Sequence, residues 1–124
     1  MKINNHMRIL LILQSAFLLT SNVQSEEQEV AGGDLYRAYC AQCHGLEGDG
    51  YGVNSYDIEV APRDHTDTSE MMARTDEDLI KTIKYGGKSV NKSVLMPNWE
   101  GNLTDDEINL LVGYLREICC KGGE

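Results

Sequence analysis

Apolar residues along the chain recur mainly at the spacing of an α-helix, and the last third shows this most clearly. There they fall three or four positions apart and form one inward stripe: Ile108, Leu111, Val112, Leu115, Ile118 and Cys119. The segment from Thr104 to Glu107 has the pattern of a full capping box, with three acidic residues at the positive end of the helix dipole. Gly122 and Gly123 are the expected end of this helix.

A second helix is predicted from about Gly33 into the cysteines at positions 40 and 43. Leu35, Tyr36 and Tyr39 are spaced for burial on one of its faces. Gly45 should end it, and glycines then recur through position 52. This loop lacks the G-K-[ST] ending of a phosphate-binding loop. It is either chain that folds closely around something flat or an ordinary flexible loop.

Two shorter helices are predicted in the middle of the chain. Thr68 to Arg74 could form one, with Met71 and Met72 as core-filling residues. The segment from Thr75 to Asp78 resembles a capping box. The helix after it places apolar residues on one face before two glycines end it: Leu79, Ile80, Ile83, Gly86 and Gly87. No alternating run is long enough for a convincing strand, so the predicted fold class is all-α.

The first 25 residues have the pattern of a secretory signal peptide. Lys2 and Arg8 make a short basic region, an apolar run follows, and Val23 and Ser25 suit the positions before a cleavage site. Cleavage after Ser25 would leave residues 26–124 as one small domain in the periplasm. The apolar run is short for a membrane span, which needs about 20 residues, although an uncleaved signal would act as a tether.

The chain is strongly acidic, with 11 Lys and Arg against 20 Asp and Glu and a formal charge of −9. Removal of Lys2 and Arg8 would leave nine basic residues against 20 acidic ones, a formal charge near −11. Such a surface repels nucleic acids and anionic lipid headgroups. It suits partners with basic docking faces, although solubility alone also explains most of these charges.

The segment Cys40-Ala41-Gln42-Cys43-His44 is the attachment pattern of a c-type haem. Each thiol can add across one haem vinyl group, and one turn of chain sets the two sulfur atoms at the vinyl separation. His44 then presents an imidazole nitrogen to the iron. The alternatives are a chance C-x-x-C sequence and a redox-active dithiol.

Taken together, these features resemble a class I c-type cytochrome across nearly the whole of residues 26–124. Gly32-x3-Tyr36-x3-Cys40 resembles the N-terminal signature of that family, and Leu111-x2-Tyr114 resembles its partner in the last helix. The resemblance implies a small cytochrome c fold with one covalent haem c. Its N- and C-terminal helices would cross nearly at right angles, with one or two further short helices around the haem.

The resemblance also implies a second iron ligand. Met96-Pro97-Asn98-Trp99 lies in a long connection from Lys88 to Leu103 and matches the family's Met-Pro-x-aromatic motif. Met96 would bind the iron opposite His44, and its thioether would raise the reduction potential relative to two imidazoles. In the family a proline carbonyl accepts the N–H of the proximal imidazole, and Pro62 is the matching residue.

His65 is the rival to Met96, because two imidazoles would make a haem of lower potential. It lies just past Pro62, on the proximal side, so we interpret it as a surface or packing histidine that titrates near neutrality. Other candidates for contacts with the haem edge or a propionate are Arg63, Trp99, Tyr51 and Tyr56, each of which could equally be an ordinary core or surface residue.

Cys119 and Cys120 depart from the family pattern. Neighbouring helical residues point about 100° apart, so Cys119 should face inward and Cys120 outward. An outward thiol in an oxidising compartment could form a disulfide-linked dimer.

The leading functional hypothesis is a one-electron carrier, not itself an enzyme, that cycles between Fe(II) and Fe(III) among redox proteins or as a subunit of an oxidoreductase. The first alternative is a periplasmic thiol–disulfide oxidoreductase using Cys40 and Cys43, which would need a βαβ framework. The second is a haem enzyme or sensor with an open sixth position. No membrane span is expected after signal cleavage.

Overall fold

The computed structural model describes residues 31–120, so the predicted signal peptide and the glycines at 122–123 lie outside the described residues. Within residues 31–120 the chain is helical, and its only bridge of β type is an isolated one between Glu100 and Leu103. This confirms the all-α prediction. The helices, in chain order, are α2 (Gly32–Tyr39), α3 (Ala41–His44), the 3-10 helix η1 (Ser55–Asp57), α4 (Thr68–Met72), α5 (Asp76–Tyr85), the 3-10 helix η2 (Gly87–Val90) and α6 (Asp105–Cys120).

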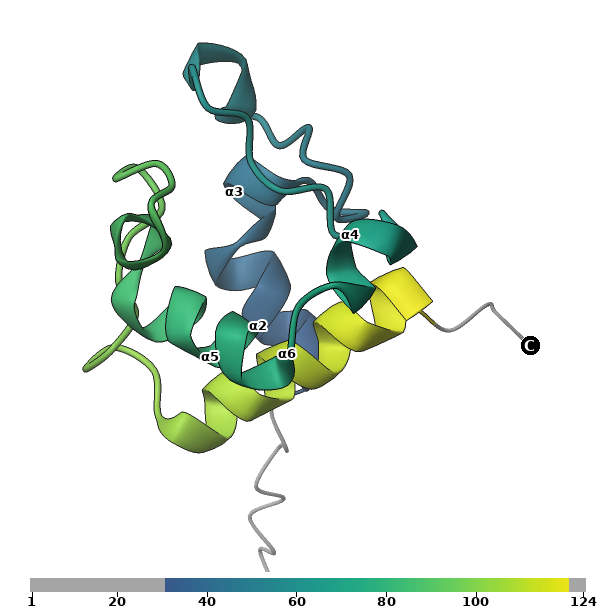
Figure 1. The fold of residues 1–124 in the computed structure, drawn as a ribbon, viewed down its shortest axis with the longest axis vertical. Coiled ribbons are helices and arrows are strands. Elements are labelled where there is room, and N and C mark those ends of the chain that lie inside the picture. Colours follow the sequence, from purple (N-terminus) through teal and green to yellow (C-terminus); the bar gives the residue numbers. More distant parts are fainter. Residues whose placement is uncertain (1–30, 121–124) are drawn as a thin grey trace, which may run out of the picture.

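The crossing of α2 and α6 organises the fold, and Figure 1 shows the two helices against each other. A Cβ atom built on Gly32 would lie 2.2 Å from the carbonyl oxygen of Leu110. Only glycine therefore allows the two backbones to approach so closely. Beside this contact the rings of Tyr36 and Tyr114 pack with their centroids 5.3 Å apart. The predicted pairing of the helix before the attachment motif with the last helix is confirmed.

The buried core gathers on α6, as its apolar stripe predicted. The stripe is buried along its length except for Ile118, which is half-buried. From the other helices, Leu35, Tyr36 and Met71 pack into the same core. Two expectations were wrong: Tyr39 is 44% exposed and Met72 is 65% exposed. Each belongs to a helix of eight residues or fewer, where few positions can face inward.

Local hydrogen bonds set where the two long helices begin. The Thr75 hydroxyl accepts from the backbone N–H of Asp78, and the Asp78 carboxylate accepts from the N–H of Thr75. At the start of α6, Thr104 and Glu107 make the same reciprocal pair of bonds. Both predicted capping boxes are therefore present. Among the described helices, none is long and apolar enough to cross a membrane.

Candidate functional site

The two cysteines of the attachment motif lie at the junction of α2 and α3. Cys40 is the residue between the helices, Cys43 lies in α3, and both thiols are free and half-buried. The glycine-rich loop folds back onto this short helix: the N–H of Gly50 donates to the His44 carbonyl at 2.8 Å, and the N–H of Gly52 donates to that of Cys43 at 3.1 Å. The loop is thus packed closely against α3, which holds the motif in place.

The state of Cys40 argues against a redox dithiol. Burial, with a smaller contribution from neighbouring Cys43, raises the pKa of the Cys40 thiol to about 12. Reactive dithiols depend on the opposite shift, because the thiolate is the nucleophile. Residues 31–120 also contain no βαβ unit. Neither condition of the oxidoreductase hypothesis is met in the part of the chain that the structure describes.

The imidazole of His44 is fixed by a backbone carbonyl. Its Nδ1 is 3.0 Å from the carbonyl oxygen of Arg63. We expected this acceptor to be Pro62, so the prediction was wrong by one residue. Burial lowers the pKa of His44, and the nearby Arg63 charge lowers it further, against the opposing effect of the carbonyl. The neutral ring therefore donates from Nδ1, which leaves Nε2 with a lone pair for a metal ion.

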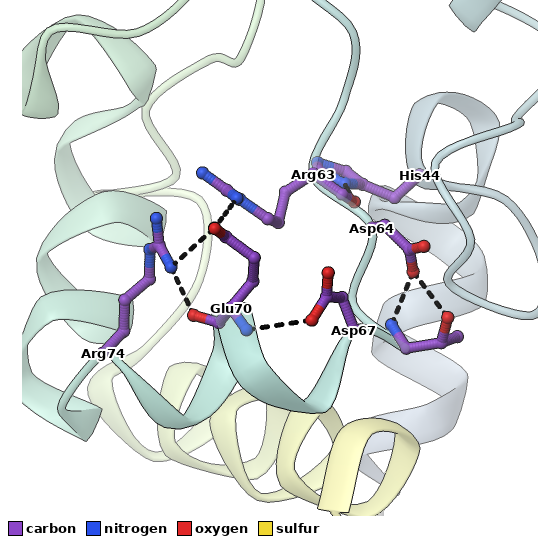
Figure 2. Close-up of polar contacts among 7 residues, drawn as sticks. His44, Arg63, Asp64, Asp67, Glu70 and Arg74 are labelled. Atoms are coloured by element: carbon purple, nitrogen blue, oxygen red, sulfur yellow. Dashed lines mark hydrogen bonds and ion pairs between the residues drawn. The ribbon is translucent and has the colours of Figure 1, made fainter.

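The backbone of Arg63 contacts His44, and its side chain contacts a different residue. Figure 2 shows its carbonyl next to His44 and its guanidinium directed to Glu70, with which it forms an ion pair. Arg74 pairs with the same Glu70 carboxylate at 3.2 Å. In the structure, the predicted propionate partner is therefore engaged with α4.

His65 lies directly beside His44 and not at the surface. It is only 9% exposed, and its ring stacks on that of His44 with centroids 4.3 Å apart and an interplanar angle of 17°. Burial and the neighbouring His44 lower the pKa of His65 to about 3. The expected titration near neutrality was wrong, because burial disfavours the charged form. The expectation of a packing role agrees with this position.

The Met96 loop is held at the end of α5. The N–H of Gly87 donates to the Met96 carbonyl at 3.1 Å, and the N–H of Trp99 donates to the Ile83 carbonyl at 3.1 Å. A Cβ atom on Gly86 would lie 2.8 Å from the Met96 carbonyl oxygen, so the paired glycines allow this loop to pack closely. Met96 itself is half-buried.

The aromatic candidates separate into one packed residue and two exposed ones. Trp99 packs against Tyr39 of α2, with ring centroids 5.2 Å apart, and so links the Met96 loop to the helix that leads into Cys40. Tyr51 and Tyr56 are 75% and 81% exposed. Several aliphatic side chains between α3 and α4 and between α5 and α6 are exposed as well: Leu46, Val53, Val60, Val94 and Leu95.

These residues fit a covalent haem c. The two free thiols are three positions apart across a helical turn, and the neutral His44 keeps one nitrogen for the iron. Aliphatic side chains just after the motif and in the Met96 loop are exposed, among them Leu46 and Leu95, and binding of a large apolar ring would remove apolar surface of this kind from water.

The second cysteine pair is bonded within the chain. Cys119 and Cys120 form a disulfide at the end of α6. Cys119 is buried, as expected, and Cys120 is half-buried. Because the Cys120 sulfur is already bonded to its neighbour, it is not available to link two chains in this state.

Solved structures that are similar to this chain include two named proteins. The first, the KustC0563 c-type cytochrome, has a TM-score of 0.60 and 24% identity, and the match covers 73% of this chain and 99% of that one. The second, from the Kuenenia stuttgartiensis reducing HAO-like protein complex Kustc0457/Kustc0458, has a TM-score of 0.59 and 31% identity, and covers 75% of this chain but 44% of that one. A search of curated proteins finds no match.

A family profile identifies the chain more directly. The profile described as cytochrome c oxidase, cbb3-type, subunit III matches residues 27–115, which is well over half of the chain. The match spans both cysteines of the attachment motif, His44 and Met96. The first of the two solved structures shares the fold and is named a c-type cytochrome. The chain therefore belongs to the cbb3-type subunit III family of cytochrome c domains and is a class I c-type cytochrome that binds haem c covalently.

Proposed function

We propose that this chain is an exported, periplasmic electron carrier with a single haem c. Cys40 and Cys43 would form the thioether bonds, and His44 and Met96 would bind the iron from opposite faces. When bound, the haem supplies one-electron exchange between Fe(II) and Fe(III). The observation that carries the proposal is the geometry of His44, whose Nδ1 is held by the Arg63 carbonyl next to two free thiols.

The chain's own residues would prepare the site for this exchange. The Arg63 carbonyl fixes the tautomer of His44, so that Nε2 carries the lone pair. The bonds from Gly87 to Met96 and from Trp99 to α5 hold the methionine loop in one conformation. A rigid ligand set favours electron transfer, because little has to move when the charge on the iron changes. With both axial positions taken, no position at the iron is left for a substrate, so we propose no enzymatic activity for the chain itself.

Redox proteins are the proposed partners. The chain's acidic composition favours partners with basic docking faces. One similar structure is a reducing HAO-like protein complex, which supports a role in which a cytochrome domain of this kind works within or beside a larger redox assembly. The match covers 44% of that protein, so this chain corresponds to one part of it.

The test is an absorption spectrum of the full chain, matured with a haem-attachment system. We expect sharp reduced haem bands, haem that survives acid–acetone extraction, and a weak far-red methionine–iron band in the oxidised protein. Met96→Ala should abolish the far-red band and keep the covalent haem. Met72→Ala is the matched control, since Met72 is 65% exposed on α4, and it should leave the spectrum unchanged.

Two results would contradict the proposal. Haem that is extracted by acid–acetone would exclude the thioether bonds of Cys40 and Cys43. A far-red band absent from the unsubstituted protein would exclude Met96 as the sixth ligand, and would instead support the sensor hypothesis with an open position or a bis-imidazole haem.

A further inference from the structure

His65 and His44 form a stack of two nearly parallel rings. Their centroids are 4.3 Å apart and the interplanar angle is 17°, so His65 covers one face of the His44 imidazole. The Arg63 carbonyl holds His44 at a single atom, Nδ1, and one hydrogen bond does not by itself fix the rotation of the ring about the axis of that bond. A flat neighbour on one face restricts this remaining rotation, because turning the imidazole would bring its edge into the other ring.

His65 is itself anchored from two sides. Its Nδ1 is 3.1 Å from the hydroxyl of Tyr36, in a hydrogen bond that is buried. Its backbone N–H donates to the Gly48 carbonyl at 2.6 Å, within the glycine-rich loop. Since its ring and its backbone are both held by hydrogen bonds, His65 is fixed in position and can restrict the movement of the His44 ring.

Tyr36, which anchors His65, is part of the crossing of α2 and α6. Tyr36 is fully buried, and its ring packs on Tyr114 of α6 with centroids 5.3 Å apart. Its contact with His65 is an edge-to-face one, with centroids 5.8 Å apart at 70°. A continuous series of contacts therefore runs from the α2–α6 crossing through Tyr36 and His65 to the proximal imidazole.

We propose that His65 is a positioning residue that sets the plane of the His44 imidazole, with Tyr36 as its anchor. This inference rests on the proposed role of His44 as an iron ligand. The orientation of an axial imidazole plane determines how its π orbitals overlap the iron d orbitals. The distribution of unpaired spin over the haem in the oxidised state therefore depends on that orientation, and the residues in contact with the axial imidazole are the ones that fix it.

The experiment uses the haem-loaded full chain and three variants. His65→Leu removes both the flat ring and the bond to Tyr36. The double variant Tyr36→Phe/His65→Phe keeps a flat ring over His44 and removes both polar partners, so that no buried donor is left unpaired. Tyr36→Phe alone keeps the stack and loosens its anchor. The readouts are the paramagnetically shifted haem-methyl resonances and the g values of the oxidised protein, together with its thermal midpoint.

We expect His65→Leu to alter the spread and order of the haem-methyl resonances and to shift the g values. Tyr36→Phe should broaden or shift the parent pattern by less than His65→Leu does. The double phenylalanine variant keeps a flat ring over His44 but also lacks the anchor, so it should shift the pattern no further than Tyr36→Phe does. A His65→Leu variant with a lower thermal midpoint but an unchanged methyl pattern would show that His65 only packs, and would overturn the proposal. The double variant decides the question if His65→Leu does not fold: its methyl pattern must stay within the shift seen for Tyr36→Phe, and a larger shift would overturn the proposal.

The spectra of the unsubstituted parent protein show whether a failure belongs to this inference or to the proposed function. If the parent carries covalent, low-spin haem with the methionine band and the variants leave the methyl pattern unchanged, only the role of His65 is overturned. If the parent binds no covalent haem, the proposed function fails, and the positioning role fails with it.

Discussion

At the scale of single residues, the guanidinium of Arg116 makes three hydrogen bonds away from the candidate site. Its Nε donates to the Asp76 carboxylate at 2.8 Å, and its two terminal nitrogens donate to the carbonyls of Met71 at 2.8 Å and Arg74 at 2.6 Å. One planar guanidinium thus joins α6 to the end of α4 and the start of α5. A lysine has no fork that could reach all three acceptors.

We predict that Arg116→Lys lowers the free energy of unfolding by about 1–3 kcal/mol, since partly buried carbonyls lose their donors. Urea denaturation of the haem-loaded protein at pH 7 measures this difference. Arg37→Lys is the control, because the ion pair of Arg37 with Asp34 is exposed, and the substitution should change stability by less than about 0.5 kcal/mol. Equal effects of the two substitutions would show that the guanidinium geometry is unimportant.

At the scale of elements, the crossing of α2 and α6 depends on one missing side chain. A methyl group at Gly32 would lie 2.2 Å from the Leu110 carbonyl oxygen, whereas one at Gly113, in the same pair of helices, would meet nothing within 4 Å. The same substitution can therefore be compared at a crowded glycine, Gly32, and at an open one, Gly113.

We predict that Gly32→Ala destabilises the protein by about 1–3 kcal/mol, because the helices must separate to admit the methyl group. Gly113→Ala should be neutral or stabilise it by up to about 1 kcal/mol, since alanine is the better helix former at an open position. Thermal unfolding of the two variants gives the comparison. A stable Gly32→Ala variant would contradict the close approach of the two backbones.

The capping box of α6 makes a prediction about pH. Hydrogen bonds from the Thr104 backbone and hydroxyl lower the pKa of the Glu107 carboxyl in the folded chain. A carboxyl with a lowered folded pKa stabilises the fold above its unfolded pKa, and this contribution is lost as the pH falls through the folded pKa. The stabilisation should therefore be complete at pH 7, decline from about pH 4.3, the pKa of an unperturbed Glu, and be lost once the pH has fallen below the lowered folded pKa.

The measurement is the difference in thermal midpoint between the parent and Glu107→Ala across this pH range. We expect the parent to melt higher at pH 7 and the gap to close on acidification. Glu107→Gln is the control: its amide oxygen can still accept from Thr104, so its midpoint should fall less on acidification than that of the parent. A gap that stays constant with pH would show that the carboxylate charge does not contribute.

At the scale of the whole molecule, the formal charge of −9 should govern encounters with redox partners. Attraction between opposite charges raises the rate of association at low ionic strength, and salt screens it over about 10 Å at 0.1 M. We predict that oxidation of the reduced protein by a small cationic metal complex slows as salt is added.

An anionic complex of similar size is the control for this effect. Its oxidation rate should rise with added salt, because screening reduces repulsion. Stopped-flow absorbance of the reduced haem band measures both rates. Identical salt dependence for the two reagents would show that the acidic residues do not act together at the site of electron transfer.

Much of this molecule follows from short stretches of its sequence. The capping boxes at Thr75 and Thr104 and the apolar stripe of α6 were predictable from such stretches. The capping boxes and the stripe depend on residues three or four positions apart. The motif from Cys40 to His44 was equally plain, since its chemistry requires a fixed local spacing.

The surroundings of His44 were decided by the tertiary structure. The carbonyl that holds His44 is 19 positions away, and the tyrosine that anchors His65 is 29 positions away from it. Every residue carries a carbonyl, so no sequence signal distinguishes Arg63 from Pro62. No sequence signal marks the burial of His65 either, because it depends on where its loop returns to the helices. The exposure of Tyr39 and Met72 depends on which side of their short helices the rest of the fold covers. By itself the sequence determined the helices and the haem motif, because both arise from neighbouring residues. Only the packed fold determined what lies against the proximal imidazole, because that contact joins segments far apart in the chain.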